Sequence, residues 1–252
     1  MRYAPADRFA PRASVDMARL PSLRQGYSAL VIGASGGIGS AVARSLEADP
    51  ACGRLLQLSR RTDPSFDVGD EASVAAAAAR FTAELDGLDL VFNATGALVI
   101  DGAGPEKSMR AIDAAAMAAQ FRLNAIGPAL LIKHFAPLLP KDRRSLFATL
   151  SARVGSIGDN RLGGWISYRA AKAAQNQIVR TAAIEIARSR PQAVLAALHP
   201  GTVETALSDP FAGKRERLTP ERSAELLLGV LDGLSAEQSG GFFAYDGSPI
   251  VW

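Results

Sequence analysis

Short apolar runs alternate with longer helical segments along most of this chain, and this alternation limits the possible folds more than any other feature. The runs have the length and composition of buried strands and span residues 29–32, 55–58, 88–93, 145–150, 193–198 and 242–245. The segments between them are typical of helices and span residues 38–46, 71–85, 108–139, 166–188 and 219–234. Such strand–helix–strand units form parallel sheets with helices on both faces. We therefore predict a three-layer, doubly wound α/β fold, with about seven strands if residues 65–68 add a very short one.

The first 27 residues differ from the rest of the chain. They contain Pro5, Pro11 and Pro21 and show no sustained periodicity. They also hold a local excess of arginine, whereas the whole chain has 28 Lys and Arg against 25 Asp and Glu. We interpret residues 1–27 as a flexible N-terminal tail and residues 28–252 as one domain. Because the domain has no basic face with interleaved aromatic residues, we expect no nucleic-acid partner.

Composition argues against several other classes of protein. The unbroken apolar runs are far shorter than the roughly 18 residues of a transmembrane helix, so we expect no membrane partner. The single cysteine, Cys52, cannot form an internal disulfide, and the spacing of His and Cys fits no metal site. A reducing, cytoplasmic setting is therefore expected.

A glycine-rich loop follows the first predicted strand and precedes the first predicted helix. From residue 33 to 39 it reads Gly-Ala-Ser-Gly-Gly-Ile-Gly. Glycine permits a tight turn and a close approach of the backbone, and the following helix N-terminus offers free N–H groups to a pyrophosphate. A plain glycine-rich turn is the alternative, but the position between strand and helix favours dinucleotide binding. The contacting residues would be Gly33, Ser35, Gly37, Ile38 and Gly39.

The end of the second predicted strand indicates which dinucleotide binds. An acidic residue usually holds the ribose 2′-hydroxyl of NAD at this place, but here the strand ends in Ser59, Arg60 and Arg61. A guanidinium group can hold a 2′-phosphate through paired N–H donors, whereas a carboxylate would repel it. We therefore predict that NADP(H) is preferred, with NAD(H) as the weaker cofactor. Two solvated surface arginines are the alternative interpretation.

Tyr168 and Lys172 lie one turn apart on the same face of a predicted helix. A free tyrosine has a pKa near 10, too high for a base at neutral pH, but a nearby ammonium group stabilises the phenolate and lowers this pKa. Such a tyrosine can exchange a proton with a carbonyl or alcohol oxygen. A tyrosine and a lysine also occur at this spacing by chance, and a surface tyrosine is then the alternative interpretation. The position of the pair after the glycine loop is therefore needed to support an active site.

The order and spacing of the glycine loop, Asn93, Asn124 and the pair Tyr168 and Lys172 resemble the short-chain dehydrogenase/reductase family. The resemblance covers residues 28–252 and implies a Rossmann fold. It also implies that Asn124 holds a water molecule that links Lys172 to a proton relay. The cofactor contacts that the family implies are Asp67, Val68, Asn93, Gly96, Tyr168, Lys172, Pro200, Gly201, Val203 and Thr205.

One position departs from the family pattern. The family's catalytic serine stands three residues before a glycine, where this chain has Ala152 before Gly155. Ser151 is adjacent, but neighbouring strand residues point to opposite faces, so a bulge would have to re-aim it toward the substrate oxygen. We predict Ser151 as the catalytic serine on that condition, and Ser156 as the alternative.

Three segments resemble the C-factor-like and sniffer-type carbonyl reductase branch of the family: residues 151–157, 162–169 and 245–252. The branch implies an NADP(H)-dependent oxidoreductase that moves a hydride between nicotinamide and a small carbonyl or alcohol substrate, with Tyr168 as acid or base. It also implies a homodimer or homotetramer, which the alanine-rich helix around Tyr168 suits. The alternative is a cofactor-binding signalling or regulatory protein with little turnover, as Ala152 would allow. A sugar-nucleotide epimerase is disfavoured, because about 50 residues follow Gly201.

Overall fold

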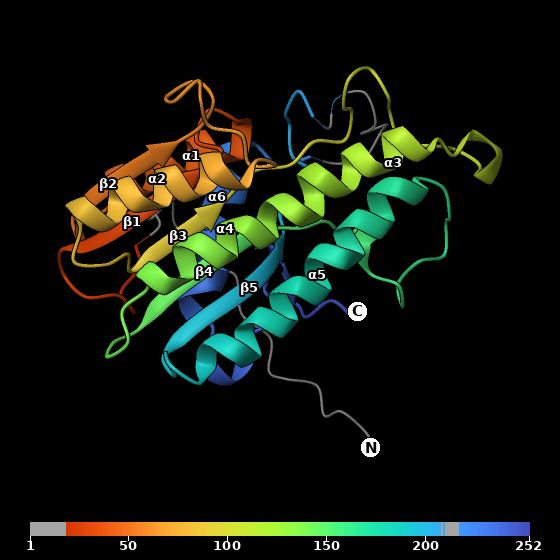
Figure 1. Cartoon of the computed structure of the whole chain (residues 1–252). Helices are drawn as coiled ribbons and strands as arrows, with labels where there is room; N and C mark the ends of the chain where they lie inside the picture. Colours follow the sequence, from red (N-terminus) through yellow and green to blue (C-terminus); the bar gives the residue numbers. More distant parts are fainter. Residues whose placement is uncertain (1–18, 208, 210–216) are drawn as a thin grey trace.

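In the computed structural model, which describes residues 19–207, 209 and 217–252, six strands form one sheet (Figure 1). Their order across the sheet is β2-β1-β3-β4-β5-β6, and all neighbouring strands are parallel. The strands are β1 (Tyr27–Ile32), β2 (Cys52–Leu58), β3 (Leu90–Asn93), β4 (Ser145–Leu150), β5 (Ala193–His199) and β6 (Gly241–Ala244).

Helices cover both faces of the sheet. They are α1 (Gly37–Glu47), α2 (Glu71–Glu84), α3 (Ala114–Phe121), α4 (Gly127–Phe135), α5 (Ile166–Ala187) and α6 (Pro220–Gly233). Helices α2, α4 and α5 lie on one face and α1 and α6 on the other (Figure 1). The predicted three-layer, doubly wound α/β fold is confirmed.

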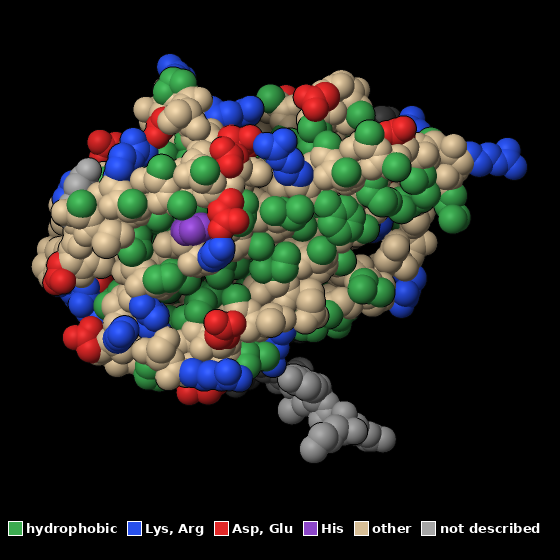
Figure 2. Space-filling view, in the orientation of Figure 1, with side chains coloured by type: hydrophobic (Ala, Val, Ile, Leu, Met, Phe, Trp, Pro, Cys, Tyr) green, Lys and Arg blue, Asp and Glu red, His purple; other side chains and the backbone are tan. Residues whose placement is uncertain are grey.

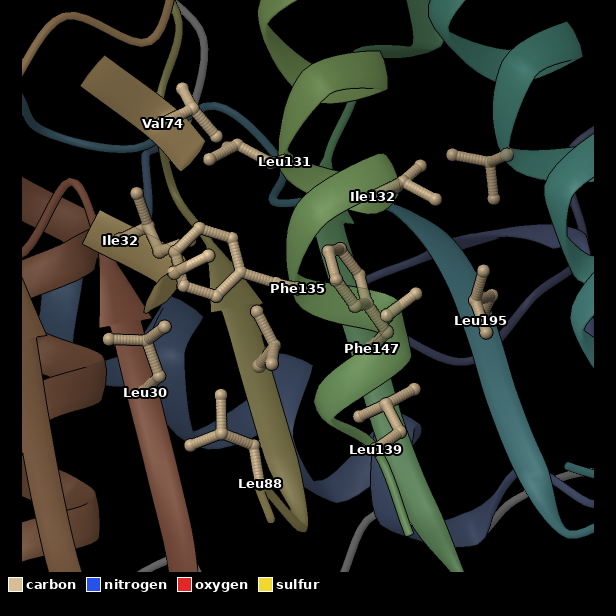
Figure 3. Close-up of a cluster of buried hydrophobic side chains, with 14 of the residues drawn as sticks. Leu30, Ile32, Val74, Leu88, Leu131, Ile132, Phe135, Leu139, Phe147 and Leu195 are labelled. Atoms are coloured by element: carbon tan, nitrogen blue, oxygen red, sulfur yellow. The ribbon is translucent and has the colours of Figure 1, made fainter. Parts of the chain in front are cut away.

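The two faces of each strand pack into two separate hydrophobic cores. On β1, Leu30 and Ile32 contact the core under α2, α4 and α5, whereas Ala29 and Val31 contact the core under α1 and α6. This follows from the alternation of side chains along a strand, and burial of both faces explains why the strands read as continuous apolar runs. Figure 3 shows the first core, in which Phe135 of α4 lies among side chains of the sheet.

The predicted seventh strand is wrong, because residues 65–68 form turns. The amide of Asp67 donates to the Ser73 hydroxyl, and the Asp67 carboxylate accepts from the amide of Gly69. The amide of Phe66 donates to the carbonyl of Asp63. These local hydrogen bonds use the backbone donors that a strand would need, and the side chain of Phe66 still packs in the first core.

The helical run from Ala114 to Leu138 is long and apolar enough, by length and composition alone, to cross a membrane. The sequence-based expectation of no membrane partner counted only unbroken apolar runs, and so did not consider this run. Leu131, Ile132 and Phe135 of this run pack into the first core against the sheet (Figure 3). Packing against the sheet therefore accounts for the buried part of this run, which is 39% of its apolar window.

Residues 19–26 pack against the domain, although they were predicted to belong to the flexible tail. Leu20 is fully buried and Leu23 nearly so, both in the second core. The amide of Leu20 donates to Asp49 at 3.2 Å, and that of Ser22 donates to Asp232 of α6 at 3.0 Å. The domain boundary predicted at residue 27 is therefore too late. Residues 1–18, the rest of the predicted tail, lie outside the described residues.

The burial of Leu20 gives a stability prediction. Leu20→Ala removes a fully buried side chain and should lower the free energy of unfolding by about 2–5 kcal/mol in a urea titration. Met109→Ala, at a side chain with 77% exposure, is the matched control and should change it by less than about 0.5 kcal/mol. Equal stability of the two variants would show that the segment before β1 does not contribute to the core.

Candidate active site

A cavity of about 620 Å³ lies at the carboxyl ends of the strands. Cavities of open parallel sheets are expected at this edge. Its walls come from segments far apart in the sequence: the glycine loop after β1, residues 94–96 after β3, residues 150–154 after β4, the first turns of α5, and residues 199–202 after β5. The predicted site residues that line it are Gly37, Ile38, Gly39, Gly96, Ser151, Tyr168, Lys172, Pro200, Gly201 and Thr205.

The glycine loop brings the start of α1 close to the end of the sheet. Gly33 has φ +82°, in the left-handed region that favours glycine. A Cβ at Gly39 would lie 2.2 Å from the carbonyl oxygen of Gly33, so any side chain there would displace the helix. The N-cap of α1 is Gly36, which offers no side-chain cap to the first-turn N–H groups. Uncapped donors at a helix N-terminus fit a pyrophosphate.

Arg60 and Arg61 are exposed just beyond β2, and within the described part of the chain neither forms an ion pair. The amide of Gly33 donates to Leu58 at 2.7 Å, which ties the end of β2 to the glycine loop. The two guanidinium groups are therefore attached beside the predicted phosphate site. They do not line the cavity, and neither does Ser35, which is exposed within the loop.

Several of the other predicted cofactor residues have structural contacts. The buried Asn93 donates to Thr149 of β4 at 2.9 Å and accepts from the amide of Thr95, so it joins β3 to β4 and shapes the next turn. The carboxylate of Asp67 pairs with Arg122 at 2.9 Å, and Val68 is buried in the first core. Val203 is also buried. None of these four predicted residues, Asn93, Asp67, Val68 and Val203, lines the cavity.

Tyr168 and Lys172 lie side by side in the first turns of α5, as their spacing predicted. Both are almost fully buried, and the Lys172 ammonium lies 5.8 Å from the centroid of the Tyr168 ring. Lys172 donates to the carbonyl of Leu150 at 3.1 Å and to Oε1 of Gln175 at 2.8 Å. Tyr168 lines the cavity, and its hydroxyl has no hydrogen-bond partner among the described residues. That hydroxyl is therefore available to a ligand.

Gln175 is a site residue that the sequence reasoning missed. It is fully buried, and its amide nitrogen donates to Thr149 at 2.8 Å and to the carbonyl of Leu150 at 3.0 Å. Since Asn93 also donates to Thr149, a polar network runs from β3 through β4 to Lys172. A glutamine three residues after the lysine, on the same helix face, was the only signal in the sequence.

Burial acts on the pKa of both members of the pair. It lowers the pKa of Lys172 to about 7 and raises the pKa of Tyr168 above its ordinary value of 10.0. The predicted lowering of the Tyr168 pKa by Lys172 is therefore not found in the protein alone, because removal from water disfavours the charged form of each group. Tyr168 keeps its proton at neutral pH.

Asn124 lies in a short π-helix, Arg122–Ile126, between α3 and α4. π-helical turns are rare and frequently lie at functional sites. Asn124 is fully buried, and its amide donates to Ala97 at 2.9 Å and to Gln120 at 2.7 Å. A Cβ at Gly96 would lie 3.1 Å from Oδ1 of Asn124 and 3.5 Å from Nζ of Lys172, so the two side chains are close. The water that the family resemblance assigns to Asn124 stays a prediction.

Neither predicted serine presents a free hydroxyl hydrogen to the cavity. Ser151 lines it, but its hydroxyl donates to Oδ1 of Asn176 at 2.6 Å. Its amide continues the ladder by donating to Leu198, so the bulge that would re-aim it is absent. The Ser156 hydroxyl donates to the carbonyl of Val251, outside the cavity. The predicted role of Ser151 is therefore not supported, and Ala152 leaves Tyr168 without a serine partner.

The loop before α5 has an unusual backbone that Arg169 holds in place. Gly163, Gly164 and Trp165 have φ of +63°, +66° and +53°, and Trp165 is not a glycine, so its conformation is strained. Arg169 donates to the carbonyls of Gly164 at 2.9 Å and of Gly163 and Val154 at 3.2 Å. The ring of Trp165 then meets Tyr168 edge-on at 6.4 Å. Arg169 therefore positions the wall beside Tyr168.

Two further polar groups complete the site. The buried Glu106 accepts from the amide and hydroxyl of Ser167, and so caps the start of α5. His199 lines the cavity, and its buried Nδ1 has no hydrogen-bond partner in the part of the chain that the structure describes. Burial lowers the pKa of His199 to about 4, so it is neutral at pH 7. No cluster of His, Cys, Asp or Glu among the described residues could hold a metal ion.

The lowered pKa of Lys172 predicts a pH-dependent stability difference. The unfolded lysine takes up a proton below about pH 10.5, whereas the folded one does so only below about 7. The folded protein therefore loses stability as pH falls through this window, and the loss is complete below it. Relative to wild type, Lys172→Met should gain melting temperature steadily from pH 10 to pH 7. The control is Lys141→Met, at an exposed side chain, which should give a pH-independent difference.

The contacts of Arg169 predict a local effect of a conservative substitution. Arg169→Lys cannot serve three carbonyl groups at once, and should cost about 1–3 kcal/mol of unfolding free energy. It should also shift the emission of Trp165 to longer wavelength, measured in a Trp252→Phe background where Trp165 is the only tryptophan. Unchanged emission together with unchanged stability would show that Arg169 does not hold this loop.

Comparisons with known proteins found a family match and relatives over most of the chain. A family model described as short chain dehydrogenase matches residues 27–216. The 1-hydroxy-2-glutathionyl-2-methyl-3-butene dehydrogenase of Rhodococcus sp. (strain AD45) is 33% identical over 232 residues, covering 88% of this chain and 98% of that protein. The C-signal of Myxococcus xanthus is 37% identical over 142 residues, covering 56% of this chain and 81% of that protein.

Solved structures with the same fold include two carbonyl reductases. The NADPH-bound carbonyl reductase from chicken fatty liver matches with a TM-score of 0.78 and 27% identity, covering 92% of this chain and 96% of that one. The carbonyl reductase Sniffer of D. melanogaster matches with a TM-score of 0.77 and 21% identity, covering 91% of this chain and 100% of that one.

Proposed function

Since the chain belongs to the short-chain dehydrogenase family and is an oxidoreductase of that family, we propose that it transfers a hydride between NADP(H) and a carbonyl or alcohol substrate. The observation that carries this proposal is that Tyr168, whose hydroxyl has no hydrogen-bond partner among the described residues, lines a cavity that the glycine loop and Lys172 also line. A positioned proton donor beside a nucleotide loop is what carbonyl reduction requires.

The residues present fit a nicotinamide dinucleotide. The uncapped N–H groups at the start of α1 would hold the pyrophosphate, and the exposed Arg60 and Arg61 would hold the 2′-phosphate. Lys172 and the segment after β5, which both line the cavity, would hold the nicotinamide half. When bound, the cofactor supplies the hydride in reduction and accepts it in oxidation.

Tyr168 supplies the proton in the reductive direction. Because burial raises its pKa, it remains protonated at neutral pH and can donate to a carbonyl oxygen as negative charge develops there. Lys172, fixed by Gln175 and the carbonyl of Leu150, places an ammonium group beside the ring. The names of the chicken reductase and of the Rhodococcus dehydrogenase, a carbonyl and an alcohol enzyme, support this substrate class.

A signalling or regulatory protein with little turnover is the second candidate. It is favoured by Ala152, at the family's serine position, and by the absence of a free serine proton in the cavity. The similarity to the C-signal of M. xanthus is consistent with it. Binding of NADPH without oxidation by any member of a carbonyl panel would favour this candidate.

Two other expectations stay proposals. A homodimer or homotetramer is supported by apolar side chains that gather over α3, α4 and α5 on the face seen in Figure 2. Ile126, between α3 and α4, and Ile184 of α5 are about half exposed. A reducing, cytoplasmic setting is supported by the free thiol of Cys52.

The role of Tyr168 can be tested by removing only its hydroxyl. In NADPH oxidation with an accepted carbonyl substrate, Tyr168→Phe should lower kcat by at least about 100-fold and leave the Kd of NADPH within about twofold. Ser151→Ala, the comparison variant, should lower kcat by less than about fivefold, because its hydroxyl hydrogen is bound to Asn176. Undiminished turnover in Tyr168→Phe would reject the proposed mechanism.

The cofactor preference can be tested by fluorescence titration. NADPH should bind at least about tenfold tighter than NADH, equivalent to about 1.4 kcal/mol. The double change Arg60→Ala and Arg61→Ala should remove most of that difference by weakening NADPH alone. Arg188→Ala, an exposed arginine just beyond α5, should leave both affinities unchanged. Equal binding of the two cofactors to the wild-type protein would contradict the prediction.

A further inference from the structure

The wall of the cavity formed by residues 153–169 carries an excess of positive charge. Three arginines from this stretch line the cavity, Arg153, Arg161 and Arg169, against a single carboxylate, Asp159. Arg153 and Asp159 form an ion pair at 3.2 Å, so these two charges offset each other. The neutral His199 on the same cavity adds no charge at pH 7.

The other two guanidinium groups have no counter-ion among the described residues. Arg169 bonds only to backbone carbonyls. Arg161 is exposed, and its one hydrogen bond to a described residue is a 3.5 Å contact with the carbonyl of Asn160. Of the two, only Arg161 keeps most of its donors free. A planar guanidinium with free donors matches a carboxylate in two parallel hydrogen bonds.

The cofactor's phosphates do not account for this charge. The pyrophosphate site is at the start of α1, and the arginines suited to a 2′-phosphate follow β2. Arg153 follows β4, which is separated from β2 by β1 and β3. Three strand spacings therefore put the end of β4 about 14 Å from the end of β2. The arginine-rich wall therefore belongs to the part of the cavity that remains for the substrate.

Apolar side chains also line the cavity: Leu98, Leu162, Trp165 and Leu207. Resting on the proposed function, we propose that the substrate is a carbonyl compound with an apolar body and a carboxylate away from the reacting oxygen, and that Arg161 binds this carboxylate. Arg161 is then a specificity-determining residue. Its charge selects the acid over an ester of the same shape, while Tyr168 acts at the other end.

Binding to the protein saturated with NADP⁺ tests this without requiring turnover. The probes are straight-chain oxo-acids of increasing length and their methyl esters, titrated by calorimetry. At the best length, the acid should bind at least about tenfold tighter than its ester. Arg161→Gln should bring the ratio of acid affinity to ester affinity close to one, because it weakens the binding of the acid alone. Arg188→Gln, the same charge change outside the cavity, should preserve it.

Three outcomes would overturn the inference: equal binding of acid and ester to the wild-type protein, an acid preference that survives Arg161→Gln, or no binding of any probe. Failure of the proposed function would give a different set of results. In that case the acid preference is present and depends on Arg161, but no oxo-acid oxidises NADPH in a Tyr168-dependent way. An acid preference that falls as salt concentration rises would support the charge mechanism.

Discussion

The site depends on a lysine side chain that the protein has removed from water. Lys172 is almost fully buried, and its hydrogen bonds to Leu150 and Gln175 attach α5 to the end of β4. Gln175 shares Thr149 with Asn93, so the first turns of α5 are fixed against both central strands. The position of Tyr168, one turn earlier, follows from this attachment. Burial of a titratable group is unfavourable by itself, and its presence at a cavity is typical of a functional site.

The parts of the site that the sequence predicted are formed by residues that lie close together along the chain. The glycine loop follows from a strand, a turn and a helix N-terminus within one short segment, and the pair Tyr168 and Lys172 from one turn of helix. The alternation of strands and helices likewise gave the layered fold. Each of these features is local, so a pattern in the chain was enough to predict it.

The predictions that failed depended on contacts between distant residues or on the direction of one side chain. Leu20 precedes the sheet in an irregular segment, and only its contact with the second core shows that it is buried. Ser151 was placed correctly at the end of β4, but its hydroxyl faces Asn176 of α5. Residues 65–68 have strand-like composition, yet side chains of Asp67 and Ser73 take part in their backbone hydrogen bonds. Gln175 belongs to no motif, and its spacing from Lys172 was the only signal in the chain.

The cavity wall before α5 is also supported from the end of the chain. The carbonyl of Val251 accepts from the Ser156 hydroxyl, and the carbonyl of Trp252 accepts from the amide of Gly158 at 2.8 Å. The ring of Trp252 stacks on Phe242 of β6. The last residues therefore support the cavity wall from behind without lining the cavity, so that a change at the end of the chain can alter the shape of the site.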